Sequence, residues 1–438
     1  MTKDIIQIFN AAVDAVKPSQ LLSNYLLVEE DAIQICGEYF PKNTLQHIYV
    51  IGAGKAVAAM AFETERILGD YITAGVITTK YGHKIATEKI KILESAHPIP
   101  DEMGEMAVKA TINLLQDVSE NDIIICLISG GASSLWCDVP TGLSLQEIQS
   151  TFELLIKSGA GIDEINIVRK HLSAIKGGQL IRYCGKAKVF SLMISDVPND
   201  DLGVIASGPT VPDSSTFQEA MDVIIKYDIL SNLPANINDY LQKGIDGIID
   251  DTPKAGDELF KNTTTRIIAN NKLAQLAAEK KAKRLGYKTM LIPEIVTGNT
   301  VVEAKQFIKT MLAHTDDKPI CIIQGGETTL KVTGHGKGGR NQHFMLVVLQ
   351  ELKKMNILDT NIEFSILSGG TDGTDGPTDA TGAMIDREVV ATIIANNLSI
   401  ESYLVNHDAY HFFEQTGNLL ITGPTQTNVM DIMIAIIQ

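Results

Sequence analysis

The sequence predicts an α/β protein of two domains. Short apolar runs alternate with helical stretches, and glycines or carboxylates follow many of the apolar runs. This order is typical of a doubly wound parallel sheet whose ligand loops lie at the strand ends. The alternation stops in the acidic, turn-rich stretch 244–258 and then restarts. We therefore expect an N-terminal doubly wound domain over residues 1–250 and a second α/β domain over residues 251–438.

Apolar periodicity places the elements of the N-terminal half. An amphipathic helix is expected within residues 3–28, and a second helix begins near Lys55. The remaining predicted helices cover 102–115 and 145–158, and the predicted strands cover 47–51, 75–80, 91–94, 122–129 and 188–195.

The C-terminal half shows the same alternation. Its predicted strands cover 266–269, 288–292, 320–324 and the surroundings of 366–367, and its predicted helices cover 270–285, 301–312, 343–354, 387–396 and 408–415. The apolar tail 429–437 fits a strand or a helix by periodicity, and its isoleucines favour a strand.

Composition narrows the classes of function. The 438 residues include 53 acidic and 37 basic ones, for a net charge of −16, which disfavours unspecific binding to nucleic acid or anionic membranes. The five cysteines form no CxxC pair, so neither a disulfide framework nor a zinc site is indicated. No stretch reaches the roughly 18 apolar residues of a membrane span. We expect a soluble, cytoplasmic protein with a small-molecule ligand.

The first candidate ligand loop is the string GAGK, which ends at Lys55 directly after the first predicted strand. Backbone N–H groups at a helix start and a mobile lysine attract anions. No Ser or Thr follows the lysine, as a Walker A loop requires. Val57 and Lys80 stand where a dinucleotide fingerprint has a small and an acidic residue, which disfavours NAD. A tight turn with a solvent-facing lysine is the alternative.

Two further segments of this half suit an anion. The loop 129–134 (SGGASS) offers hydroxyl and backbone N–H donors, although a serine-capped turn has the same composition. Arg169 and Lys176 belong to a basic segment of an otherwise acidic protein, where a solvated face is the alternative. Asp196 follows the strand 188–195 and is well placed for work as a base or metal ligand.

The C-terminal half carries two glycine-rich loops. Lys337 and Arg340 flank glycines in a basic loop that suits closure over negative charge, and an exposed hairpin tip is the alternative. The run FSILSGGTDGTDGPTD places Asp372, Asp375 and Asp379 in one loop. Such crowded carboxylates indicate either a hard-ion or phosphate-linked site or a solvated acidic turn.

Nine stretches between Ile51 and Val429 resemble one family. They are IGAGKAVAAMA, SAHPIPDE, SGGASSL, VRKHLSAIKGG, SDVPNDDLGVIASGPTVPD, GGETT, GKGGRNQ, GGTDGTDGPTDATGA and LLITGPTQTNV. The chain is similar in these stretches to the glycerate 2-kinases, the type II glycerate kinases with a MOFRL C-terminal domain. It departs from the usual pattern at Ala132 and Asn199, where glycine is common, and at His343, where glutamate is common.

The resemblance implies ATP-dependent phosphorylation of D-glycerate at its 2-hydroxyl, which gives 2-phospho-D-glycerate and ADP. It implies a Rossmann-like N-terminal domain, a MOFRL domain and an active site in the interdomain cleft. ATP and Mg²⁺ are the implied cofactors, and no nucleic-acid or membrane partner is expected. A homodimer is one assembly to test.

The resemblance carries over to three residues, and the candidate loops and segments described above supply the other expected site residues. Lys55, Asp196 and Arg340 are expected to be catalytic. The substrate or phosphate is expected at Gly54, Ser129, Gly130, Gly131, Ser133, Ser134, Arg169 and Lys176. The nucleotide is expected at Gly325, Gly326, Glu327, Thr328, Lys337, Asn341, Gly370 and Thr371, and the metal at Asp372 and Asp375.

Two other functions remain open on the sequence. One is an NAD(P)-dependent hydroxypyruvate reductase, because GxGK at a strand end is compatible with a dinucleotide. The other is a non-catalytic protein that binds a sugar acid.

Overall fold

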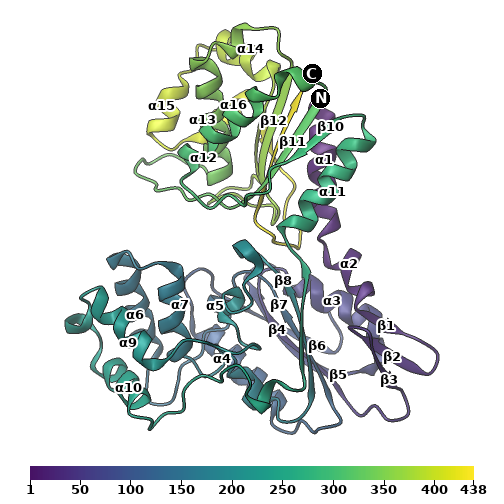
Figure 1. Cartoon of the computed structure of the whole chain (residues 1–438), viewed down its shortest axis with the longest axis vertical. Coiled ribbons are helices and arrows are strands. Elements are labelled where there is room, and N and C mark those ends of the chain that lie inside the picture. Colours follow the sequence, from purple (N-terminus) through teal and green to yellow (C-terminus); the bar gives the residue numbers. More distant parts are fainter. The chain divides into compact units, whose positions relative to one another are not determined.

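A computed structural model describes all 438 residues, which form two compact units (Figure 1). The N-terminal unit comprises Leu21–Ile268, and the C-terminal unit comprises Met1–Gln20 and Ala269–Gln438. These units differ from the expected ranges 1–250 and 251–438 at the first helix and at the junction. The first helix packs in the C-terminal unit, because its apolar face matches a surface far away in the sequence.

The main sheet of the N-terminal unit is doubly wound, as predicted. Its order is β6-β5-β4-β7-β8-β9. The strands are β4 (Ile48–Ala53), β5 (Ile72–Lys80), β6 (Ile90–Ser95), β7 (Ile123–Ile128), β8 (Lys188–Ile194) and β9 (Thr263–Ala269). Strands β4 to β8 pair in parallel. The order reverses between β4 and β7, and ligands of such sheets bind at the reversal point.

Helices cover this sheet and extend it. They are α3 (Val57–Leu68), α4 (Glu102–Leu115), α5 (Ala132–Leu135), α6 (Leu145–Ser158), α7 (Ile162–His171), α8 (Leu180–Tyr183), α9 (Phe217–Lys226) and α10 (Ala235–Ile245). Helices α4 and α6 have the predicted bounds. Helix α6 starts at a capping box between Ser144 and Glu147, which satisfies donors of its first turn. Helices α6, α7, α9 and α10 share a separate apolar core (Figure 1).

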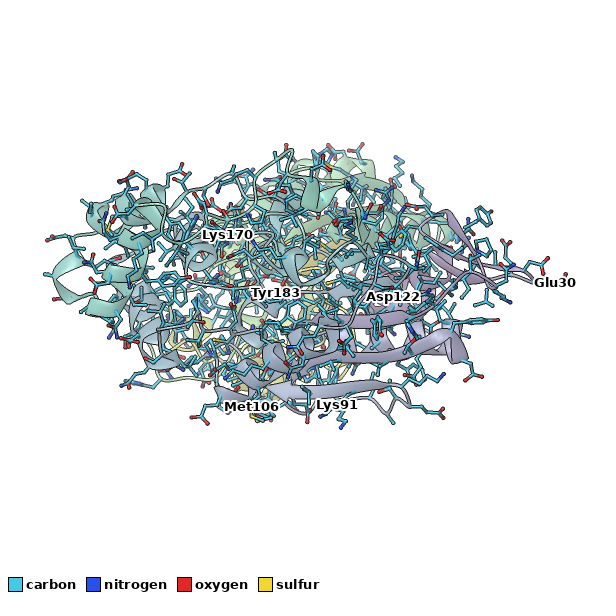
Figure 2. The ribbon with its side chains drawn as sticks, turned by 90° about the horizontal axis from the view of Figure 1, so that it is seen from below. Glu30, Lys91, Met106, Asp122, Lys170 and Tyr183 are labelled. Atoms are coloured by element: carbon cyan, nitrogen blue, oxygen red, sulfur yellow. The ribbon has the colours of Figure 1, made fainter.

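A small antiparallel sheet precedes β4. It consists of β1 (Leu26–Val28), β2 (Ala32–Ile35) and β3 (Glu38–Pro41), and Figure 2 shows Glu30 of its first turn at the outer end. The prediction of helix as far as residue 28 is therefore wrong beyond α1 (Thr2–Ala15), because Pro18 only starts the single turn α2 (Pro18–Leu21).

The C-terminal unit has a mixed sheet in the order β10-β11-β15-β12-β13-β14. Its strands are β10 (Lys288–Leu291), β11 (Ile320–Gly326), β12 (Phe364–Gly370), β13 (Gly382–Ile385), β14 (Leu419–Leu420) and β15 (Asp431–Ile437). The tail is a strand, as its isoleucines predict. Every residue of β15 is buried, because β15 lies between β11 and β12 and is antiparallel to both.

Helices cover both faces of this sheet (Figure 1). Helix α1 packs with α11 (Asn271–Arg284) on one face. The others are α12 (Thr300–Ala313), α13 (Arg340–Lys354), α14 (Arg387–Ala395), α15 (Ile400–Val405) and α16 (Ala409–Thr416). No helix of the protein combines the length and the apolar character that crossing a bilayer would require.

Candidate active site

Three neighbouring strands of the N-terminal unit deliver polar residues to one edge of the sheet. In register, Ala53 of β4 lies beside Ile128 of β7, which lies beside Met193 of β8. The chain therefore leaves β4 toward Lys55, β7 toward the SGGASS loop and β8 toward Asp196 at the same edge. This edge adjoins the reversal point of the strand order, where a ligand is expected.

The loops after β4 and β7 are in direct contact. A Cβ atom on Gly54 would lie 2.1 Å from the Ser129 Oγ atom, so only glycine fits there. The Lys55 N–H donates to the carbonyl of Gly130 at 2.9 Å, and the Ala56 N–H donates to the Ser129 hydroxyl at 3.0 Å. The hydroxyl of Ser129 thus holds the two loops together.

Lys55, Gly131 and His97 meet at this edge. Gly131 has a φ of 83°, and a Cβ atom on it would lie 3.0 Å from the His97 ring and 3.3 Å from the Lys55 Cγ atom. Burial, together with the charges of Lys55 and Lys80, lowers the pKa of His97 to about 4, so its ring is neutral at pH 7. The sequence interpretation missed His97, although it belongs to the stretch SAHPIPDE that follows β6.

A polar chain leads from the SGGASS loop to Arg169. The hydroxyls of Ser133 and Ser207 lie 2.9 Å apart, and Ser207 donates to the Asn166 Oδ1 atom at 3.2 Å. Arg169 donates to the same Oδ1 atom at 2.6 Å, and its guanidinium lies 5.1 Å from the centre of the Phe152 ring. Asn166 and Ser207 are further residues that the sequence interpretation did not assign to the site.

Arg169 carries a charge that no carboxylate balances. Burial lowers the pKa of its guanidinium to about 10, and the one opposing influence comes from Cys137. Buried charges are normally paired. Arg169 is partly desolvated and lacks an acidic partner, so its guanidinium is available to an anion.

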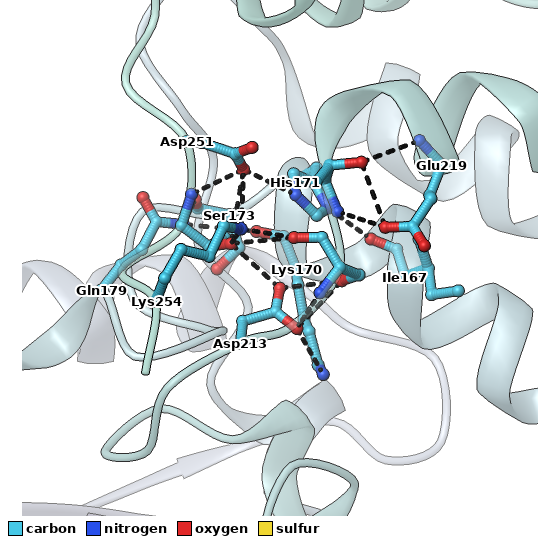
Figure 3. A network of polar contacts seen from close by, with 12 residues as sticks. Ile167, Lys170, His171, Ser173, Gln179, Asp213, Glu219, Asp251 and Lys254 are labelled. Atoms are coloured by element: carbon cyan, nitrogen blue, oxygen red, sulfur yellow. Dashed lines mark hydrogen bonds and ion pairs between the residues drawn. The ribbon is translucent and has the colours of Figure 1, made fainter. Parts of the chain in front are cut away.

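The other basic residues of this segment have partners within the protein. Lys176 is 4% exposed, and its Nζ atom lies 2.7 Å from the Trp136 carbonyl oxygen and 2.9 Å from the Asp138 Oδ1 atom. Lys170 pairs with Asp213 at 3.1 Å, in the network of Figure 3. Lys176, which was expected at the substrate or phosphate, is therefore accounted for by a buried ion pair.

The loop that begins at Asp196 has a constrained backbone. Asp196 itself is partly exposed. Asn199, Asp200, Ala206 and Ser207 all have φ between 55° and 64°, a range that non-glycine residues rarely adopt. Asparagine tolerates this conformation, which explains why Asn199 can replace the glycine that is common at this position. Such conformations concentrate in functional loops.

In the C-terminal unit, Arg340 lies between two carboxylates. Its Nε and Nη2 atoms donate to the two oxygens of Asp431 at 2.6 and 2.9 Å, and its Nη1 atom lies 2.7 Å from Glu327. Burial opposes the charge of Arg340, but Asp431 and Glu327 raise its pKa. In register, Asp431 lies beside Gly326 of β11 and Gly370 of β12. Arg340 therefore lies beside the glycine ends of two strands.

Asp375 is a helix cap and does not fit the expected metal site. It is 1% exposed, and its two oxygens accept the backbone N–H groups of Asn341 and Gln342 at 3.0 and 2.8 Å. It thereby caps α13, whose own N-cap residue is Gly339. Burial raises the pKa of Asp375 to about 6, against the effect of these bonds. Both oxygens are already engaged, so the expected Asp372 and Asp375 pair does not fit a magnesium site.

Several residues expected at the nucleotide have buried side chains that bond within the protein. The hydroxyl of Thr328 accepts from Thr300 at 3.0 Å, the Asn341 Oδ1 atom accepts from Ser368 at 2.6 Å, and Thr371 donates to the Met430 carbonyl at 2.6 Å. Lys337 lies with its Nζ atom 3.9 Å from the centre of the Tyr410 ring. Gly325 and Gly326 end β11, where a Cβ atom on Gly326 would lie 2.2 Å from the Val296 carbonyl oxygen.

These features define a class of protein, namely an α/β protein with a doubly wound unit and a mixed-sheet unit. Lys55 follows a strand of the first sheet, and Arg340 lies beside two strand ends of the second. The MOFRL family model matches residues 320–431, and the model described as a domain of unknown function, DUF4147, matches residues 4–242. The chain belongs to the MOFRL-domain glycerate kinase family.

Relatives of known name cover the whole chain. A protein of Pyrococcus horikoshii named glycerate 2-kinase is 36% identical, with 99% of this chain and 96% of the relative covered. A D-glycerate 2-kinase of Thermotoga maritima is 37% identical, with 100% and 98% covered. A protein of Agrobacterium vitis named putative hydroxypyruvate reductase is 35% identical, with 97% and 92% covered.

Solved structures agree with the fold. The crystal structure of a glycerate kinase from Thermotoga maritima has a TM-score of 0.85 at 35% identity, with 100% of this chain and 99% of that chain covered. A crystal structure of a Pyrococcus horikoshii protein has a TM-score of 0.82 at 36% identity. The predicted α/β architecture is confirmed.

Proposed function

We propose that this protein transfers the terminal phosphoryl group of ATP to the 2-hydroxyl of D-glycerate and releases 2-phospho-D-glycerate and ADP. The observation that carries the proposal is the charge of Arg169, which no carboxylate balances, close to the loops after β4 and β7. The names of the glycerate kinase relatives supply the substrate.

Arg169 would bind the carboxylate of glycerate. A guanidinium matches a carboxylate with two parallel hydrogen bonds, and a desolvated one binds it more strongly than a solvated one. Asn166 fixes the guanidinium on one side, and the Phe152 ring supports it. Hydrogen bonds through Ser207 and Asn166 connect Ser133 of the SGGASS loop with Arg169. This loop would therefore lie beside an acid that Arg169 binds.

Lys55 and Asp196 would act on the reacting atoms. The oxygen of the 2-hydroxyl forms a bond to the γ-phosphorus as the bond from that phosphorus to the β,γ-bridging oxygen breaks. Asp196 would orient the hydroxyl and accept its proton, and Lys55 would neutralise charge that develops on the transferred group. Lys55 follows β4 and Asp196 follows β8, the two strands that flank β7, so both residues lie at the same edge of the sheet.

Arg340 would handle nucleotide phosphates in the C-terminal unit. Asp431 fixes its orientation through two hydrogen bonds, and a phosphate oxygen would compete with Glu327 for the Nη1 atom. We retain Mg²⁺ as the counterion that ATP carries. We no longer assign it to Asp375, because the oxygens of that carboxylate cap α13.

The release of ADP tests this function. ADP is measured with Mg²⁺ and ATP, in the presence and the absence of D-glycerate. We expect release that depends on glycerate. Release at the same rate without glycerate, or none with it, would overturn the proposal.

The reductase alternative is tested in parallel. The name of the Agrobacterium vitis relative supports it, but Lys80 ends β5, beside β4, where NAD-binding folds of this strand order carry an acidic residue. We expect no oxidation of NADH or NADPH with hydroxypyruvate. Rapid oxidation would favour the reductase over the kinase.

A further inference from the structure

His97 lies at the edge where the strands deliver the proposed catalytic residues. It follows β6, two strands away from β4 in the sheet, and yet its ring contacts the loop after β7. The Cδ2 and Nε2 atoms of its ring are both 3.0 Å from the position that a Cβ atom on Gly131 would take. The same position is 3.3 Å from the Lys55 Cγ atom, so the ring lies beside the stem of Lys55.

The ring nitrogens of His97 have no hydrogen-bond partner in the protein, and only burial and the charges of two lysines act on the ring. His171 in the same unit shows the contrast. Its Nδ1 atom lies 2.8 Å from the Ile167 carbonyl oxygen and its Nε2 atom 3.0 Å from Asp251 (Figure 3). The nitrogens of this half-buried ring are not among the buried polar atoms that lack a partner, so solvent reaches them, and a ligand at this edge can bond to them in place of water.

We infer that His97 is a substrate-positioning residue that hydrogen-bonds the hydroxyl group of the acid that is not phosphorylated. This inference rests on the proposed function. It assigns a protein partner to the hydroxyl group that is not phosphorylated, because the charged residues suit other groups of the reactants. Arg169 suits the carboxylate and Lys55 suits the phosphoryl group. A neutral imidazole has one donor and one acceptor, which matches a hydroxyl group better than an anion.

The lack of a side chain at Gly131 leaves space for the His97 ring. A Cβ atom at this position would crowd the imidazole at 3.0 Å, and the φ of 83° already disfavours residues other than glycine. His97 would therefore lie flat against the loop backbone and turn a nitrogen toward the bound acid.

The role predicts discrimination between two acids. D-Lactate has a methyl group where D-glycerate has a hydroxymethyl group, so it lacks the 3-hydroxyl and would leave His97 without a partner. Sites built to hydrogen-bond a substrate hydroxyl reject analogues that lack it. We expect the KM for D-glycerate to rise about 10- to 100-fold in His97→Leu, as the loss of one such hydrogen bond to a substrate predicts. The inhibition constant of D-lactate should change less than threefold.

The experiment compares wild type, His97→Leu, His97→Gln and the control His314→Leu, whose ring nitrogen lies 2.9 Å from the Asp317 carboxylate. The glutamine variant keeps an N–H donor and a carbonyl acceptor and should fall between wild type and the leucine variant. The KM for ATP should stay unchanged in all four proteins. Between pH 6 and 8 the wild-type KM for glycerate should be flat, because the ring stays neutral.

Two results would overturn the role of His97. One is an unchanged KM for glycerate in His97→Leu. The other is an inhibition constant of lactate that rises as much as the KM, since a purely structural role affects both acids equally.

Failure of the proposed function is distinguishable from failure of this inference. If wild type releases no ADP with glycerate, calorimetric dissociation constants of the two acids replace the kinetic ones. Selective loss of glycerate affinity in His97→Leu then supports the inference without the kinase, and absence of binding to wild type overturns both.

Discussion

Replacement of Arg169 by methionine should separate function from stability. Methionine keeps an apolar stem of similar length against Phe152 and removes the guanidinium that no carboxylate balances. Truncation of a paired buried arginine destabilises a protein, because its partner is left charged and buried. Arg169 has no such partner, so its loss should cost little stability.

The pKa of Arg169 indicates how strongly the stability of the folded protein should respond to the loss of this charge. Burial lowers it from 12.5 to about 10, and one pKa unit corresponds to about 1.4 kcal/mol, so the folded protein disfavours the charge by at most about 3.5 kcal/mol. The hydrogen bond that remains to Asn166 contributes about 1 to 2 kcal/mol in the opposite sense. The free energy of unfolding of Arg169→Met should therefore stay equal to wild type or rise by up to about 2 kcal/mol.

Binding should respond in the opposite direction. A hydrogen bond to a charged group contributes about 1.5 to 3 kcal/mol, so the KM for glycerate should rise about 10- to 150-fold. The assay pairs urea unfolding with steady-state kinetics. Arg182→Met is the control, because Arg182 is more exposed and bonds to the Asp251 carbonyl. A loss of more than about 3 kcal/mol of stability, or a wild-type KM, would refute the reasoning.

Other variants test the remaining structural claims. Lys55→Ala should lower turnover at least about 100-fold with an unchanged circular dichroism spectrum, and near-normal turnover would remove Lys55 from the catalytic set. Asp375→Ala should lower the free energy of unfolding by about 2 to 4 kcal/mol in urea titrations, because two N–H groups of α13 lose their acceptor. An unchanged urea midpoint would contradict the role of Asp375 as a helix cap. Gly54→Ala should yield little folded protein by size-exclusion chromatography, since its Cβ atom would lie 2.1 Å from the Ser129 Oγ atom, and a wild-type yield and melting temperature would show that the loops can separate. His343→Phe should flatten the pH dependence of the free energy of unfolding between pH 6.5 and 4, where wild type should lose up to about 1.4 kcal/mol per pH unit. Equal slopes of the free energy of unfolding against pH in the two proteins would contradict the low pKa of His343.

The sign of the His343 effect follows from its pKa. Burial and the neighbouring His407 lower this pKa from 6.5 to about 4. Between these values the unfolded chain takes up a proton that the folded protein does not, so stability is complete above pH 6.5 and is lost as the pH falls toward 4.

Local patterns predicted most of the fold. The isoleucine-rich tail became the buried strand β15, and α4 and α6 have their predicted bounds, because apolar periodicity and caps act within a few residues. Packing between segments that are distant in the sequence could not be predicted from these local patterns. Helix α1 belongs with the C-terminal unit, and helices α9 and α10 were not predicted because they lie in a stretch where loop residues dominated the interpretation.

The sequence predicted which loops belong to the candidate site, but it did not predict the partners of their side chains. GAGK and SGGASS were recognised as loops at strand ends, and the strand order brings them together. The partners of Lys176 and Asp375 depend on atoms distant in sequence, so their charge alone indicated ligands where the structure has an ion pair and a helix cap. His97 had two signals, its position after a strand and its place in the family-like stretch SAHPIPDE, and neither of them pointed to a role for its ring.

The most direct test of the central claim is the proton-coupled ³¹P NMR spectrum of the product formed from ATP and D-glycerate. Phosphorylation of the 2-hydroxyl places the phosphorus beside a single methine proton, and the account predicts a doublet that appears only with glycerate. A triplet would show phosphorylation of the 3-hydroxyl and contradict the assigned position. The absence of any new phosphate ester would contradict the kinase itself.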